Sequence, residues 1–214
     1  GALVSLVRLR AVVSDRGGAR VNELAEQRVV PVIRCPDVED AVLTARAAAA
    51  AGMRVIELTL TTPDVHEAIR ELADLVVGLG TLTSADDVAP AVEAGAAFLV
   101  SFGNPPGFVA AAREAGVPAL PGVLTPGEAL AAGTDVMKLF PARLVSPAYL
   151  RDLAAVMPEA RFVPTGGIGP DTARAWLDAG AFAVGLGSSL GTVAAVGADE
   201  VEQRCRAALA AVVG

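Results

Sequence analysis

The sequence predicts an α/β fold, a (β/α)₈ TIM barrel with an N-terminal helical extension. Composition is the first observation: 53% of the residues are hydrophobic but only 4% are aromatic, as expected when buried parallel strands alternate with Ala-rich helices. The second is a strand-then-helix pattern that repeats along the chain without a large interruption. The 214 residues suit one domain, 1–214, in which 1–28 form the helical extension.

Eight short apolar segments predict the strands. Each is bounded by Gly, Pro, Thr or Asp, the residues that commonly end strands. In chain order they span residues 29–34, 54–60, 76–79, 97–101, 118–120, 135–140, 161–164 and 182–185.

Helices are expected before, between and after these strands. An amphipathic opening at 3–13 and a second segment at 21–27 form the extension, and 198–213 closes the chain. The helices between strands span 38–51, 64–75, 85–94, 106–115, 147–156 and 172–179. Most are followed by a glycine that can end a helix: Gly52, Gly95, Gly116 and Gly180.

Consecutive βα units favour a closed barrel over an open, doubly wound sheet. A dinucleotide-binding sheet would carry GxGxxG after its first strand, and no such loop follows Arg34. In barrels the reacting groups gather where the strands end, at the carboxyl face. The site residues are therefore expected there.

Charge and cysteine content exclude several classes of function. The net charge of −7 argues against nucleic acid as a partner. No stretch approaches about 20 uninterrupted apolar residues, so no membrane partner is expected. The apolar start at 2–7 is broken at Arg8, which favours a cytoplasmic protein over a secreted one. Cys35, Cys205 and the single histidine, His66, have no metal-site spacing, so we expect no metal and no cofactor.

Lys138 is the single lysine among seventeen basic residues, and it lies inside an apolar strand segment. Strand alternation places Val136, Lys138 and Phe140 on one face, with Met137 and Leu139 on the other. An inward lysine is desolvated, which favours the neutral amine that attacks a ketone to form a Schiff base. The alternative is a lysine that pairs with a carboxylate in the barrel or extends to its rim.

Glu57 is the candidate general acid and base. It lies in a run otherwise suited to a buried strand, where a carboxylate must be paired or used, and Thr59 and Thr61 share its face. Near Lys138 it could shuttle the protons of carbinolamine formation and of carbon–carbon cleavage. A structural ion pair between Glu57 and Lys138 is the alternative.

Two glycine-rich corners follow the seventh and eighth predicted strands. They contain Thr165, Gly166 and Gly167 in the first, and Gly187 and Ser188 in the second. Barrels commonly bind phosphate there, because exposed backbone N–H groups favour an anion. Tight βα connections also explain such glycines.

Three further residues have side chains that can take part in chemistry. Thr81 ends the third strand and could hold a substrate oxygen or cap the next helix. His66 is expected on the surface of a helix, and Cys35 in the core or at the rim rather than as a nucleophile.

The assembled motifs resemble the class I 2-keto-3-deoxy-6-phosphogluconate (KDPG) and 4-hydroxy-2-oxoglutarate (KHG) aldolases, from Val29 to nearly the end of the chain. The likeness rests on residues 29–33, 56–60, 78–81, 120–123, 137–142 and 164–168, in the family's order and spacing. The Lys-x-Phe-Pro-Ala segment beginning at Lys138 is the most specific.

The resemblance implies a metal-independent lyase of sugar-acid (Entner–Doudoroff) metabolism, which cleaves a keto acid, expected to be phosphorylated, into pyruvate and glyceraldehyde 3-phosphate or glyoxylate. Family members are typically homotrimers. By this likeness Lys138 matches the Schiff-base lysine, Glu57 the proton-transfer glutamate and Thr81 a pyruvate-binding threonine. Further substrate contacts are expected from Thr59, Thr61 and Thr165. The phosphate is expected to bind at Gly166, Gly167, Gly187 and Ser188.

The sequence departs from the family pattern at two places. Thr61 stands where many members carry an arginine that holds the substrate carboxylate, and Arg34 is the nearest candidate to replace it. The usual Ser-Pro-Gly after the fourth strand reads Ser101-Phe-Gly103.

Other functions stay open from sequence alone. One is an aldolase of the galactonate type, which cleaves the C4 epimer of the same acid. The preference between the two epimers depends on a few residues in the wall of the site. A phosphosugar epimerase or synthase, or a non-catalytic barrel that binds a phosphorylated metabolite, would use the glycine corners without an imine. Imine trapping separates the aldolases from the last three.

Overall fold

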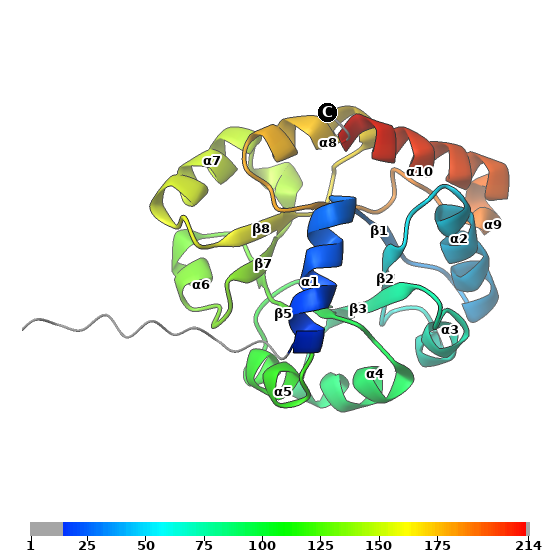
Figure 1. Ribbon diagram of the computed structural model, residues 1–214, viewed down its shortest axis with the longest axis horizontal. Helices are drawn as coiled ribbons and strands as arrows, with labels where there is room; N and C mark the ends of the chain where they lie inside the picture. Colours follow the sequence, from blue (N-terminus) through cyan, green and yellow to red (C-terminus); the bar gives the residue numbers. More distant parts are fainter. Residues whose placement is uncertain (1–14, 213–214) are drawn as a thin grey trace, which may run out of the picture.

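A computed structural model describes residues 15–212, with side chains from Val21 onward. Its strands form a ring that helices surround (Figure 1). The strands are β1 (Val29–Ile33), β2 (Val55–Thr59), β3 (Val76–Leu82), β4 (Leu99–Ser101), β5 (Ala119–Leu120), β6 (Gly122–Val123), β7 (Val136–Leu139), β8 (Arg161–Pro164) and β9 (Val184–Leu186). All pairings between them are parallel, which confirms the predicted α/β barrel class.

The helices lie outside the ring, except α1, which lies across one end of it (Figure 1). They are α1 (Asp15–Gln27), α2 (Val38–Ala50), α3 (Val65–Glu71), α4 (Val88–Ala94), α5 (Phe108–Glu114), α6 (Pro126–Leu130), α7 (Pro147–Val156), α8 (Pro170–Asp178), α9 (Val193–Val196) and α10 (Ala198–Val212), with 3₁₀ turns η1 (Ala85–Asp87) and η2 (Ala142–Leu144). Among the described helices none is long and apolar enough to cross a membrane.

The ring consists of two sheets, β5-β4-β3-β2-β1-β9 and β6-β7-β8, that meet at two seams. At the first seam Pro121 has no N–H to donate, so it separates β5 from β6, and its carbonyl accepts a hydrogen bond from Lys138 N–H at 2.9 Å. At the second, Thr165 pairs with Gly185, and Phe182 N–H donates to the Phe162 carbonyl at 2.9 Å. The eight predicted strands thus close into one barrel, and the fifth, predicted at 118–120, is followed beyond Pro121 by β6, which was not predicted.

Side chains fill the barrel interior and leave about 10 Å³ of free space, room for about one water molecule. Alternate strand residues such as Val30, Val100 and Val136 point inward and form one apolar cluster. The Phe98 ring fits because Gly78 has no Cβ; one placed there would lie 2.2 Å from the ring. The interior is therefore a packed core below the carboxyl face.

Helix α1 closes the amino end of the barrel. Its Val21 and Leu24 join the inner cluster. The Gln27 side chain accepts hydrogen bonds from the N–H groups of Arg54 and Val55 and donates to the Val29 and Val55 carbonyls. The opposite, carboxyl face is left for chemistry.

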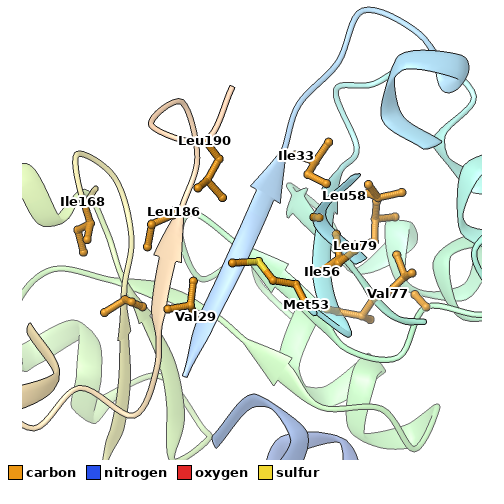
Figure 2. Close-up of a cluster of buried hydrophobic side chains, with 14 of the residues drawn as sticks. Val29, Ile33, Met53, Ile56, Leu58, Val77, Leu79, Ile168, Leu186 and Leu190 are labelled. Carbon is orange, nitrogen blue, oxygen red and sulfur yellow. The ribbon is translucent and has the colours of Figure 1, made fainter. Parts of the chain in front are cut away.

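The outer strand faces pack against the helices in a second, larger cluster. Figure 2 shows the part of it along β1, β2 and β3, with Met53, Ile56 and Leu58 buried among its members. Met137 and Leu139 belong to this outer cluster and Val136 to the inner one, so the predicted alternation around Lys138 is confirmed.

Several predicted boundaries were wrong. The segment 64–75 is helical only over Val65–Glu71, because Leu72 to Leu75 form a turn. The helix predicted at 106–115 begins at Phe108, after Gly107 in the left-handed region. The helix predicted at 21–27 begins at Asp15, and β3 runs three residues past 79.

The helix predicted at 3–13 and the end of the last one, at 213, lie outside the described residues. Two short helices were not predicted, α6 and α9. Each has a threonine N-cap, Thr125 and Thr192, whose side chain accepts a backbone N–H.

Candidate active site

The ammonium of Lys138 and the carboxylate of Glu57 meet inside the carboxyl end of the barrel. Lys138 Nζ donates to Glu57 Oε1 at 3.1 Å, and the two residues are 5% and 4% exposed. Lys138 comes from β7 and Glu57 from β2, on opposite sides of the ring. Phe140 covers the amine with its ring centroid 5.6 Å from Nζ.

Gly80 on β3 provides the space that Glu57 occupies. Glu57 pairs with Gly78, and its side chain extends over Gly80 two residues further on. A Cβ at position 80 would lie 1.9 Å from Glu57 Oε1, so any side chain there would displace the carboxylate. The glycine is thus part of the site although it has no reactive group.

A buried pair of this kind can exchange a proton. As ammonium and carboxylate the two groups neutralise each other; after transfer they become a free amine beside a carboxylic acid. A structural ion pair would have the same geometry, and imine trapping with pyruvate distinguishes it from a catalytic pair.

Arg34 extends from the end of β1 toward the ends of β2 and β3. Its guanidinium donates to Thr61 Oγ1, and also to Thr81 Oγ1 at 3.4 Å. Thr61 Oγ1 lies 3.1 Å from Thr59 Oγ1, and Thr59 is fully buried. The structure thus places a cation beside Thr61, the position where the resemblance leads one to expect an arginine.

Thr81 adopts a strained backbone conformation. Its φ of 67° lies in the left-handed region, which a β-branched residue rarely adopts, and the β3–β4 register shifts between Leu79 and Leu82. Such strain is commonly retained at functional sites. The bulge brings the Thr81 hydroxyl to Arg34.

The two glycine corners lie side by side on the carboxyl face. Gly166 and Gly167 both have positive φ, 99° and 82°, a conformation that favours glycine. Ser189 Oγ donates to the Ile168 carbonyl at 2.9 Å and joins the corners. The predicted Ser188 is exposed, Gly187 is half-buried and Thr165 is buried. The predicted phosphate residues are thus close together.

Phe102 lies next to Gly122, a residue of the strand that neighbours Lys138. It is 50% exposed, and its backbone packs against Gly122, whose Cβ would lie 2.1 Å from the Phe102 carbonyl carbon. Gly122 is in turn the register partner of Lys138. The departure noted at Ser101-Phe-Gly103 therefore alters a surface near the amine.

The remaining candidates lie away from this pair. Cys35 is buried, as predicted, and burial together with Asp40 raises the pKa of its thiol to about 12. His66 is half-buried rather than on the surface, and its Nε2 has no partner within the described residues. No three metal-ligating side chains gather within residues 15–212.

Sequence reasoning missed Gly80, Gly185 and Arg143. Gly80 lies in a motif that was recognised, but its spatial role depends on a contact between strands. Gly185 leaves space for Thr165, whose Oγ1 would lie 2.3 Å from a Cβ there. Arg143 follows the Lys-x-Phe-Pro-Ala motif and lies against Gly167. No sequence signal identified it.

The barrel with its buried lysine–glutamate pair is the arrangement of a class I aldolase, an enzyme that cleaves carbon–carbon bonds through an imine on lysine. A family model described as "KDPG and KHG aldolase" matches residues 21–206, most of the chain. The chain belongs to this aldolase family.

Relatives and solved structures agree with this assignment. The 2-dehydro-3-deoxy-phosphogluconate aldolase of Treponema pallidum is 42% identical over 153 residues, 68% of this chain and 73% of that protein. The KHG/KDPG aldolase of Escherichia coli is 38% identical over 157 residues, 70% and 74% of the two chains. The KDPG aldolase of Legionella pneumophila, solved with pyruvate captured as a covalent carbinolamine intermediate, has a TM-score of 0.81 at 30% identity over 88% and 97% of the chains.

Proposed function

We propose that the protein reversibly cleaves KDPG, or KHG, to pyruvate and glyceraldehyde 3-phosphate or glyoxylate, with Lys138 as the imine-forming nucleophile. The observation that carries this proposal is the buried contact of 3.1 Å between the single lysine and Glu57. The names of the similar aldolases support the substrate class.

Imine formation begins when Glu57 takes a proton from the Lys138 ammonium. The free amine attacks C2 of the keto acid and forms a carbinolamine. Glu57 then returns a proton to the carbinolamine hydroxyl, which leaves as water, and a protonated imine remains. The low exposure of both groups limits competing hydrolysis.

Cleavage uses the imine as an electron sink. Glu57, again a carboxylate, takes the proton of the C4 hydroxyl, and the C3–C4 bond breaks. The aldehyde leaves, and the electron pair of the broken bond passes to the imine, which becomes an enamine. Protonation of the enamine at C3 and addition of water release pyruvate and regenerate the amine. One carboxylate serves each proton transfer because it lies within hydrogen-bond reach of Nζ.

Substrate binding is assigned to the surrounding polar groups. Arg34, fixed by Thr61 and Thr81, would bind the C1 carboxylate in place of the arginine that the family pattern has at position 61. Thr59 and Thr165 would line the site at the level of the imine. The corners at Gly166, Gly167, Gly187 and Ser188 would offer backbone and hydroxyl donors to a phosphate.

The family resemblance also supports a homotrimer that acts in the cytoplasm. Light scattering of the purified protein measures the mass of the assembly and tests the first part. A mass of one or two chains would contradict it.

The activity is tested by incubating the protein with KDPG, its C4 epimer and KHG in the presence of a chelator, and by following pyruvate with lactate dehydrogenase. We expect pyruvate from KDPG or KHG, and none from the Lys138→Arg variant, whose guanidinium cannot form the imine. Cleavage of the epimer alone would favour the galactonate-type aldolase. No cleavage of any of the three would contradict the proposal.

A further inference from the structure

Arg143 lies against the first glycine corner. It belongs to η2, directly after the segment that follows Lys138, and its N–H donates to the Gly166 carbonyl at 2.9 Å. Its side chain runs along Gly167: a Cβ there would lie 2.7 Å from Arg143 Cβ and 3.7 Å from Cδ. The missing side chain at Gly167 is therefore what lets the arginine stem lie on the corner.

The guanidinium of Arg143 is available for a ligand. It is exposed, and within residues 15–212 it has neither an ion-pair nor a hydrogen-bond partner. Five of the other described arginines instead form ion pairs with carboxylates: Arg46, Arg161, Arg174, Arg204 and Arg206.

The local charge makes a cation useful at this corner. Asp171, in the first turn of α8, has its Oδ1 close to Gly169, where a Cβ would lie 2.7 Å from it. A phosphate that approached the backbone donors would meet this carboxylate on a protein of net charge −7. Arg143 supplies the compensating charge, in a planar fork that suits phosphate.

We propose that Arg143 is a specificity-determining residue that binds the terminal phosphate of the substrate and favours KDPG over KHG. The inference rests on the proposed function. Lys138 is level with Val163, so Gly166 lies three residues further along the chain, about 10 Å at the rise of a strand. The phosphate at the far end of a six-carbon acid extends toward this corner. The second carboxylate of KHG is attached to the carbon that bears the hydroxyl, and stays near the imine.

The test compares Arg143→Ala and Arg143→Lys with the unaltered protein on both substrates. Arg143→Ala is expected to raise KM for KDPG about tenfold and to leave KM for KHG within about twofold. Arg143→Lys keeps the charge but lacks the planar guanidinium, so its KM for KDPG should lie between those of the unaltered protein and of Arg143→Ala. The matched control is Arg151→Ala, which removes an equal charge from an exposed position of α7 and should leave both KM values unchanged.

Two measurements separate this proposal from the proposed function. Pyruvate with borohydride should label Arg143→Ala as fully as the unaltered protein, because the imine site is intact. Calorimetric titration with inorganic phosphate should show about tenfold weaker binding in Arg143→Ala, whether or not KDPG is cleaved. Equal phosphate affinity, or an equal loss on KDPG and KHG, would overturn the role of Arg143.

Discussion

Gly80→Ala should disable the proton transfers without touching a reactive group. The new Cβ would lie 1.9 Å from Glu57 Oε1, whereas ordinary contact begins at 3.4 Å, so this oxygen must retreat by about 1.5 Å. The contact with Lys138, now 3.1 Å, would then exceed hydrogen-bond reach. A displacement of about 1 Å can cost about 100-fold in rate, so we expect kcat to fall about 100-fold or more.

The assay follows pyruvate release from the preferred substrate, with thermal unfolding monitored by circular dichroism. Overpacking should cost about 1–3 kcal/mol in stability, so the variant is assayed well below its Tm. Gly127→Ala is the control, because a Cβ at that position in α6 meets nothing within 4 Å. A folded Gly80→Ala protein with kcat within about twofold of the original would refute the assigned role of Glu57.

The remaining predictions concern the carboxylate, the arginine and the thiols. Glu57→Gln should lower kcat about 100-fold or more, measured in the same assay; an unchanged kcat would leave Glu57 a purely structural partner. Arg34→Ala should raise KM for pyruvate in the condensation direction about tenfold; an unchanged KM would contradict the assignment of Arg34 to the substrate carboxylate. Burial raises the thiol pKa of Cys35 to about 12 and of Cys205 to about 11, against 9.0 normally, so the unfolded chain loses these protons first. Stability in urea should therefore fall as pH rises above about 9, and less steeply in the Cys35→Ala, Cys205→Ala double variant; equal slopes would contradict this.

The central pair was predictable because its sequence signals are local. A single lysine within an apolar strand, and a glutamate within another, can be assigned to the interior by alternation alone. The barrel topology then brings the ends of β2 and β7 to the same face, and the structure places the two groups in contact.

Other features depend on contacts that a linear pattern does not specify. Whether the flexible Arg34 side chain turns toward Thr61 is decided by its neighbours in space, and the strain at Thr81 follows from a shift in strand register. The interruption at Pro121 could have been inferred from its missing N–H. Helix α6 was predictable as well, because Thr125-x-x-Glu128 is a capping box, a sequence signature of a helix start.

Imine trapping tests the central claim most directly. The protein is incubated with pyruvate and sodium borohydride, its intact mass is measured, and the modified residue is mapped. The Lys138→Arg variant is the control, because any adduct that it gains must lie on the N-terminal amine. We predict one reduced pyruvate adduct, located on Lys138 and absent from the control. A folded protein that gains no adduct, or gains it equally in the Lys138→Arg variant, would contradict the assignment of Lys138 as the nucleophile.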